Sequence, residues 1–376
     1  MSDDSAAFAA LFTTNLGLQP GERIVVFSDT IRPDEAPLPA DRDRRERLVQ
    51  AAEALGRFAR DTRGNATFLT YPATAAAGTE PPEPLWRTVL GEAIVDRLAA
   101  AGLLERLLRK EANPEELEQA RAIVLERPTD VARVVVALAD RSTSHTRFRS
   151  LACAAGARYA SLPNFDPTMF STSMRVDWPA LAQRTARLAE VVNRAEELRL
   201  VCPNGTSMRF DKRGRIAKGD DGLLTSPGSF GNLPAGEVYL APLEGTSEGT
   251  MVLEYAPTRQ LASPLTLTVR EGRVTAVVGD EPYREKLIGK FAESELNRNI
   301  AELGIGTNDR ASRPDNILEA EKILGTVHIA LGDNSGFGGT VSTPFHEDYV
   351  FYRPTLTALL ANGREEILLA DGKLLS

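Results

Sequence analysis

Residues Val131–Leu138 read VARVVVAL, a nearly unbroken run of apolar and mostly β-branched side chains that ends at the polar sequence DRSTSHT. A run of this kind predicts a strand buried on both faces, as the strands of parallel sheets are. The neighbouring elements alternate in type: strands are predicted at Glu22–Phe27, Ala66–Tyr71 and Arg158–Leu162, and helices at Asp41–Arg60, Glu83–Glu126 (interrupted near Asn113) and Arg147–Ala155. This alternation predicts βαβ units and an α/β region with an open, mostly parallel sheet.

The second half of the chain has a different pattern, with short alternating segments separated by turns from Glu197 onward. The runs LTLTV and RVTAVV are joined at Glu271-Gly272, which indicates a hairpin, and Asp371-Gly372 indicates another. One helix is predicted at Pro282–Ile300. We therefore expect an N-terminal α/β domain over residues 1–190 and an α+β, mostly antiparallel domain over residues 191–376.

Length and composition limit the classes of protein. A chain of 376 residues predicts two domains, and 42% hydrophobic with 26% charged residues is typical of a globular protein. The net charge of -8 and pI near 5.3 argue against nucleic-acid binding. No apolar stretch is long enough to cross a membrane, and no basic secretory signal is present at the N-terminus, so we expect a cytoplasmic protein. Cys153 and Cys202 are too few for a disulfide framework.

Two of the three histidines indicate a metal site. His328 lies in EKILGTVHIALG, a predicted strand that leads into a glycine-rich turn, and His346 lies in STPFHEDYVFY. Side chains two residues apart in a strand point to the same face, so His346 and Asp348 can hold one ion while Glu347 points away. An imidazole and a carboxylate on one face suit zinc, manganese, cobalt or iron.

Two acidic segments add candidate ligands. Glu237 begins an apolar strand in NLPAGEVYLAP, and Glu302 precedes a glycine-rich turn in AELGIGTN, where we expect the end of a helix. Turns bounded by glycine or proline let the backbone approach a bound ion closely. The C-terminal half therefore offers five candidate ligands in such turns.

These segments, in this order, resemble the aminopeptidase T family, the thermophilic metalloprotease family of dinuclear aminopeptidases. The N-terminal half adds GERIVV and TSHTRFRSLACAAGARYASLP, so the resemblance covers nearly the whole chain. It implies an N-terminal α/β domain that faces a C-terminal catalytic domain, and a homodimer. It also implies a set of metal ligands: Glu237, Glu302, His328, His346 and Asp348.

The chain departs from this family after the first metal histidine, where the peptidases carry a tyrosine. Here the loop reads GDNSGFGGTVST, with Ser335 near that place and no tyrosine before Tyr349. A relative of similar fold, 2,5-dihydroxypyridine dioxygenase, holds a single iron with two histidines and one aspartate and opens a ring. The reaction is therefore not fixed by the resemblance.

The preferred interpretation is a metal-dependent aminopeptidase with two ions (zinc, cobalt or manganese) that activate a water molecule. One alternative is a mononuclear non-haem iron ring-cleaving dioxygenase that uses His328, His346 and Asp348, and another is a non-catalytic binding protein. We expect a peptide or small-molecule substrate, with contacts from Ser335, His145 and Thr146, and no nucleic-acid or membrane partner. The general base is not identified.

Overall fold

The computed structural model describes residues 4–375, which form two compact units. Unit 1 runs to Arg175 and also includes Gly222–Pro234; unit 2 consists of Val176–Asp221 and the chain from Ala235 onward. This division differs from the expected boundary after residue 190 because helix α8 (Trp178–Arg194) belongs to unit 2. There the hydroxyls of Thr185 and Thr307 are hydrogen-bonded at 2.7 Å.

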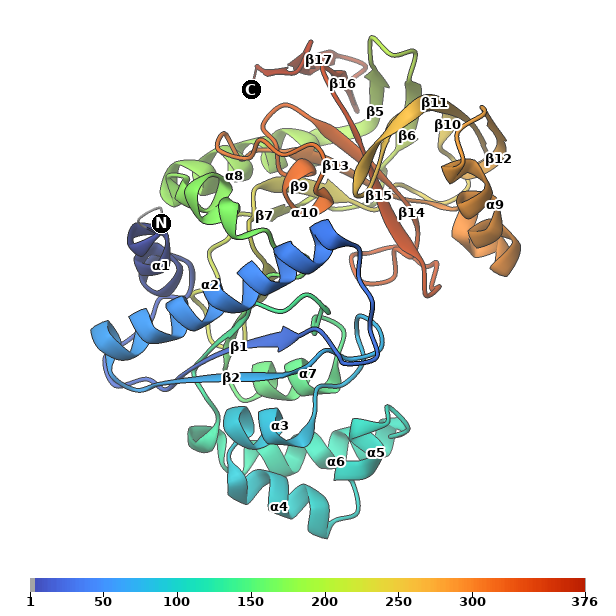
Figure 1. Ribbon diagram of the computed structural model, residues 1–376. Helices are drawn as coiled ribbons and strands as arrows, with labels where there is room; N and C mark the ends of the chain where they lie inside the picture. Colours follow the sequence, from blue (N-terminus) through green and yellow to red (C-terminus); the bar gives the residue numbers. More distant parts are fainter. Residues whose placement is uncertain (1–3, 376) are drawn as a thin grey trace. The chain divides into compact units, whose positions relative to one another are not determined.

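Unit 1 contains a parallel five-stranded sheet in the order β2-β1-β3-β4-β8. Its strands are β1 (Ile24–Thr30), β2 (Ala66–Pro72), β3 (Val134–Ala137), β4 (Arg158–Ser161) and β8 (Phe230–Asn232). Figure 1 shows its strands β1 and β2 side by side. Every residue of β3 and β4 is buried, as the apolar run around β3 predicted. The prediction of a parallel α/β region is confirmed.

The helices of unit 1 are α1 (Ser5–Ala10), α2 (Pro39–Arg63), α3 (Glu83–Leu90), α4 (Glu92–Ala100), α5 (Leu104–Leu108), α6 (Pro114–Leu125) and α7 (Arg147–Ala154). The predicted tract from Glu83 to Glu126 is thus four helices. Gly91 and Gly102 end two of the segments, with φ of 97° and 72°, a conformation that a continuing helix cannot contain.

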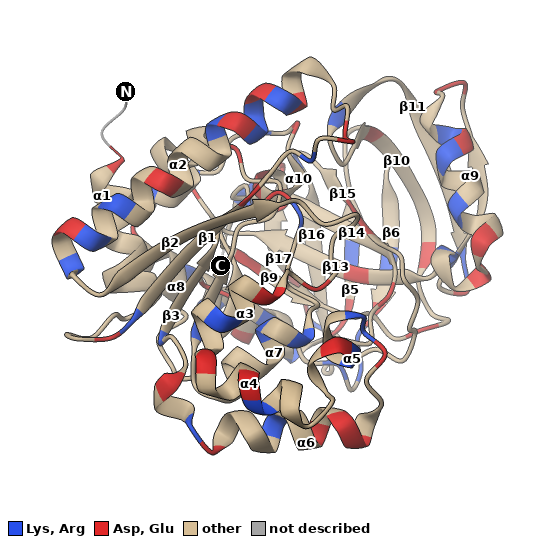
Figure 2. Cartoon of the chain, turned by 60° about the horizontal axis from the view of Figure 1, so that its bottom comes forward, with Lys and Arg blue, Asp and Glu red and all other residues tan. Residues whose placement is uncertain are grey.

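Helix α2 has one charged and one buried face. Arginines are interspersed with acidic residues along it (Figure 2), and neighbouring turns are joined by pairs such as Arg47–Asp43 at 2.9 Å. Its other face is buried through Leu48, Ala52 and Leu55. No helix within residues 4–375 is both long and apolar enough to cross a membrane.

Unit 2 is built from two mostly antiparallel sheets, which confirms the predicted fold class of the second half. The larger sheet has the order β12-β11-β10-β6-β5-β16-β17-β18 and the smaller has the order β15-β14-β13-β9-β7. The strands of the larger sheet are β5 (Ala195–Val201), β6 (Ser207–Asp211), β10 (Glu248–Ala256), β11 (Arg259–Arg270), β12 (Arg273–Val278), β16 (Thr355–Leu360), β17 (Glu365–Ala370) and β18 (Lys373–Leu374). Those of the smaller are β7 (Lys218–Asp220), β9 (Glu237–Leu240), β13 (Ile300–Gly306), β14 (Val327–Gly332) and β15 (His346–Phe351).

The smaller sheet has one apolar face. Val238, Leu303, Ile305 and Ile329, among others, point into a core that also contains residues of the larger sheet. Because side chains alternate along a strand, the residues between these apolar positions stand on the opposite face. That face is available for polar chemistry.

The predicted helix Pro282–Ile300 is too long. The helix α9 (Tyr283–Glu293) is followed by a 3-10 turn, Glu295–Arg298, before strand β13 begins. Ser294 interrupts the helix, because its backbone is extended and its side chain caps the next turn by accepting a hydrogen bond from Leu296 N–H. The short helix α10 (Ile317–Ala320) lies between β13 and β14.

Candidate metal centre

The register of the smaller sheet places all the candidate ligands on one face. They are Glu237 in β9, Glu302 in β13, His328 in β14, and His346 and Asp348 in β15. Residues that pair across an antiparallel sheet share a face. Asp348 and Glu302 both pair with Ala330, two residues from His328, and Glu237 pairs with Gly306, which shares the face of Glu302.

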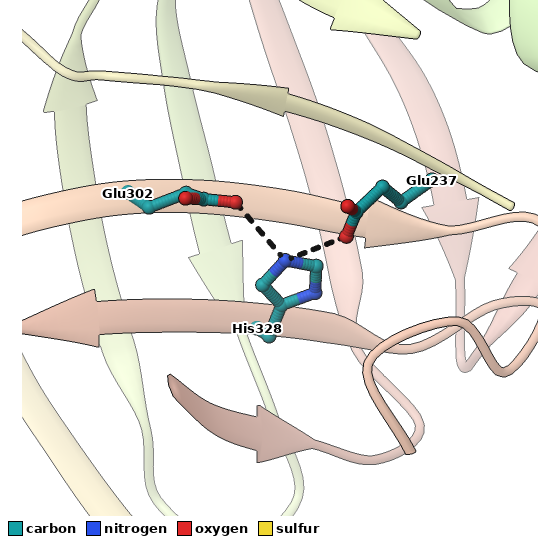
Figure 3. A group of neighbouring side chains, drawn as sticks. All are labelled: Glu237, Glu302 and His328. Atoms are coloured by element: carbon teal, nitrogen blue, oxygen red, sulfur yellow. Dashed lines mark hydrogen bonds and ion pairs between the residues drawn. The ribbon is translucent and has the colours of Figure 1, made fainter. Parts of the chain in front are cut away.

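The donor atoms form two groups that share one carboxylate. His328 Nε2 lies 3.1 Å from Glu237 Oε2 and 3.4 Å from Glu302 Oε1, and its ring points between the two carboxylates (Figure 3). His346 Nε2 lies 3.6 Å from Glu302 Oε2 and 3.6 Å from Asp348 Oδ2. Within each group the donor atoms are all within 4.8 Å of one another. An imidazole with two carboxylates is a donor set for a divalent metal ion.

These residues lie inside strands, so the prediction that they occupy glycine- or proline-bounded turns is wrong, as is the placement of Glu302 at a helix end. The glycines of β13 make room for neighbours. A Cβ at Gly304 would lie 1.9 Å from His328 Nε2, and a Cβ at Gly306 would lie 2.1 Å from the carbonyl oxygen of Ile323. The GIG sequence therefore indicates close approach within a sheet and not a turn.

The charges of the cluster favour a bound cation. Burial would lower the pKa of His328, but hydrogen bonding to Glu237 and Glu302 outweighs burial and raises that pKa well above its usual value. For His346, burial also lowers the pKa, but Asp348, Glu302 and the Asp333 carbonyl together outweigh burial and raise the pKa to about 10. The buried atom Glu237 Oε2 faces the imidazole of His328, whose Nε2 lies 3.1 Å away. A metal ion would replace the protons of both histidines and satisfy the negative charge around them.

The loop between β14 and β15 orients His346. The Nδ1 atom of His346 lies 2.8 Å from the carbonyl oxygen of Asp333, so Nδ1–H donates a hydrogen bond to that oxygen and Nε2 faces the carboxylates. Buried Asn334 fixes this loop by donating to Glu244 and by accepting from Val341 N–H. The hydroxyl of Ser335 is exposed and donates to the Asp333 carboxylate at 3.0 Å. A substrate contact by Ser335 stays a prediction.

Sequence reasoning missed Lys322, which follows α10 and is buried. Its Nζ lies 2.6 Å from Glu237 Oε1 and 2.9 Å from Glu321 Oε1. Burial would raise the pKa of Glu237, but the positive charge of Lys322 and the hydrogen bond to His328 together outweigh burial and lower that pKa to about 2. No local sequence pattern indicates that Lys322 is buried at the site, because its position depends on contacts between segments that are distant in the sequence.

Two aromatic residues beside the cluster were also missed. Tyr239 pairs with Gly304, so its side chain stands on the ligand face of the sheet. Its ring contacts Phe337 with centroids 5.8 Å apart, and Phe337 in turn contacts the imidazole of His346 at 6.0 Å. Burial, together with the charge of Glu237, raises the pKa of Tyr239 to about 12, so its hydroxyl is a donor at neutral pH.

The remaining predicted contacts lie in unit 1. Thr146 caps helix α7: its hydroxyl accepts from Arg149 N–H and donates to the Thr143 carbonyl. His145 is exposed and lines a pocket of about 670 Å³ with residues of α6 and α7. Their contact with substrate stays a prediction.

The close packing of Gly304 against His328 leads to a first test. Gly304→Ala is expected to push the imidazole away from the carboxylates and to weaken metal binding by roughly tenfold to a hundredfold, the usual effect of disturbing a residue that orients a ligand. Metal titration of purified protein measures this. Gly289→Ala is the control, because a Cβ there meets nothing within 4 Å. Equal metal affinity in Gly304→Ala and wild type would contradict the geometry.

Comparisons with known proteins show similarity to a dioxygenase family and to two solved structures. A family model described as NicX, 2,5-dihydroxypyridine 5,6-dioxygenase, matches residues 130–359. The solved structure of 2,5-dihydroxypyridine dioxygenase from Pseudomonas putida KT2440 has a TM-score of 0.66 and 17% identity, over 100% of this chain and 97% of that chain. Wild-type AmpT from Thermus thermophilus has a TM-score of 0.59 and 16% identity, over 99% of each chain. At such identities both structures show a shared fold only. No curated protein sequence matches the chain.

Proposed function

Because the chain belongs to the 2,5-dihydroxypyridine 5,6-dioxygenase family, we propose that it is a mononuclear iron enzyme that opens a hydroxylated aromatic ring with dioxygen. The observation that carries the proposal is the match over residues 130–359, which include every candidate ligand. The substrate class is a dihydroxylated pyridine or a closely related ring.

The expectation of a metallo-aminopeptidase is wrong. The family match is to a dioxygenase, an oxidoreductase and not a hydrolase or protease. The resemblance to aminopeptidase T extends to the fold, at 16% identity with AmpT. The donor residues alone did not separate the two reactions, because both chemistries use histidines and carboxylates on a divalent ion.

In this proposal His328, His346 and Asp348 are the ligands of iron(II); His328 comes from one group of donor atoms, and His346 and Asp348 come from the other. Two histidines and one carboxylate are the protein ligands of many non-haem iron oxygenases, in which open positions remain for substrate. When bound, the iron would bring dioxygen and the ring together and make oxygen reactive toward the ring. The hydrogen bond from His346 Nδ1 to Asp333 supports this role, because it directs Nε2 toward Asp348.

The two glutamates receive other roles. Glu302 lies between the two histidines, and burial raises the pKa of its carboxyl, which makes it a suitable acceptor for the proton of a ring hydroxyl. Glu237 is neutralised by Lys322 through Oε1, and its Oε2 lies 3.1 Å from His328 Nε2. Lys322 thus leaves the charges of Glu302 and Asp348 to balance a single divalent ion.

The test is oxygen uptake. Protein reconstituted with iron(II) under nitrogen is expected to bind about one ion per chain, as a two-histidine, one-carboxylate site does. On addition of 2,5-dihydroxypyridine and air, it should consume oxygen in a one-to-one ratio with loss of ring absorbance, and zinc-loaded protein should not. Release of amino acids from aminoacyl amides by the zinc-loaded protein, with no oxygen uptake by the iron-loaded form, would overturn the proposal.

A further inference from the structure

The rings of Tyr239, Phe337 and His346 lie together at the ligand face of the smaller sheet. Only His346 among them is a proposed iron ligand. Phe337 meets Tyr239 edge-on, with centroids 5.8 Å apart and planes at 72°. It meets the imidazole of His346 in the same manner, at 6.0 Å and 87°. These rings connect the β9 side of the cluster with the β15 side.

Tyr239 and Phe337 are both half-buried, so each ring has an exposed part beside the charged cluster. The register sets the place of Tyr239, because it pairs with Gly304, whose other partner across the sheet is His328. Gly304 has no side chain to separate the phenol from the imidazole. In residues 4–375, no side chain or backbone group is hydrogen-bonded to the Tyr239 hydroxyl, although Glu237, Glu302 and Asp220 are near enough to affect it electrostatically. The phenol is therefore an available donor at the edge of the site.

Phe337 offers a complementary surface. It lies in a loop whose backbone is fixed by Asn334, with Phe337 N–H and Gly339 N–H both directed to the Asn334 carbonyl oxygen at 3.4 and 2.9 Å. A fixed phenyl ring beside the histidines and carboxylates of the cluster suits a flat ligand that is apolar on its faces and polar at its edge. The polar atoms at the edge of such a ligand would contact the polar side chains of the cluster, while its ring would pack against Phe337.

We propose that Tyr239 and Phe337 orient the aromatic substrate, with Phe337 packing against the ring and the Tyr239 hydroxyl donating a hydrogen bond to one ring oxygen. This inference rests on the proposed function, because it needs a hydroxylated aromatic ligand. It goes beyond that function in assigning the residues that decide which ring is accepted and which of its oxygens is held.

The experiment measures anaerobic binding by calorimetry, with iron(II)-loaded protein and three probes: 2,5-dihydroxypyridine, 2-hydroxypyridine and 3-hydroxypyridine. Tyr239→Phe keeps the ring and removes only the donor. It is expected to weaken binding of 2,5-dihydroxypyridine by roughly tenfold to a hundredfold, as for a hydrogen bond to a charged or strongly polar group. The loss should vanish for whichever monohydroxylated probe lacks the bonded oxygen. Phe337→Leu should weaken all three probes by about twofold to tenfold, the range of an aromatic pair.

Tyr255→Phe is the matched control, since Tyr255 is also a half-buried strand tyrosine and its ring contacts Tyr352 at 5.3 Å. It should bind every probe like wild type. A loss in Tyr239→Phe that is equal for the three probes, or no loss at all, overturns the inference while binding and turnover by the wild type leave the proposed function standing. If the wild type binds none of the probes and consumes no oxygen with 2,5-dihydroxypyridine, the proposed function fails and the inference fails with it.

Discussion

Asp348→Ala is expected to abolish metal binding and ring cleavage together. Asp348 Oδ2 lies 3.6 Å from His346 Nε2, and the carboxylate is the one anionic ligand assigned to the iron. Removing a direct ligand should weaken metal affinity by more than the roughly tenfold to hundredfold seen when only an orienting partner is lost. Oxygen uptake with 2,5-dihydroxypyridine should fall to the level of metal-free protein.

The measurement is metal content by elemental analysis after desalting, with oxygen uptake on the same sample. Asp371→Ala serves as control, because Asp371 is an exposed hairpin residue paired with Arg353 in the larger sheet. Full iron content and full turnover in Asp348→Ala would show that the metal is held elsewhere. Loss of metal in both variants would point to a general effect on folding.

Lys322→Met is expected to lower the stability of the metal-free protein strongly. The substitution removes the ammonium that lies 2.6 Å from Glu237 and 2.9 Å from Glu321 and leaves these two carboxylates without their lysine partner. Breaking a buried ion pair from one side costs about 3–5 kcal/mol. For a unit of this size, such a loss lowers the melting temperature by on the order of 10 °C.

Thermal unfolding is measured with a chelator present, because a bound metal ion would itself neutralise carboxylates of the cluster. Lys290→Met is the control: Lys290 pairs with Glu293 on the surface, where an ion pair contributes about 1 kcal/mol or less. The double variant Lys322→Met, Glu237→Gln should recover part of the lost stability. A melting temperature of Lys322→Met equal to that of wild type would mean that the ion pair makes no net contribution.

The parts of the site that depend on local sequence were predictable. The spacing of His346 and Asp348 indicated one face of a strand, and Glu347 indeed points away, accepting a hydrogen bond from the Tyr349 hydroxyl at 2.6 Å. The alternating elements of the first half likewise gave the parallel sheet, because strand and helix periods are local properties.

Other parts depend on which segments pair, and no local pattern records that. Lys322 is 85 residues from Glu237, and its contact with that residue follows from the position of α10. Tyr239 looked like an ordinary strand tyrosine until its register with Gly304 placed it beside the ligands. Glu302 was misplaced because glycines were interpreted as turn residues, whereas here they allow His328 to approach β13.

The return of Gly222–Pro234 to unit 1 limits how this protein can be divided or recombined. The edge strand β8 of the parallel sheet is encoded between two stretches of unit 2, so neither unit is a contiguous piece of the gene. A cut after Arg175 or after residue 190 would deprive β4 of its neighbour Phe230–Asn232. To combine either unit with a different partner unit, by natural gene fusion or by engineering, both the segment up to Arg175 and the internal segment Gly222–Pro234 must therefore be exchanged.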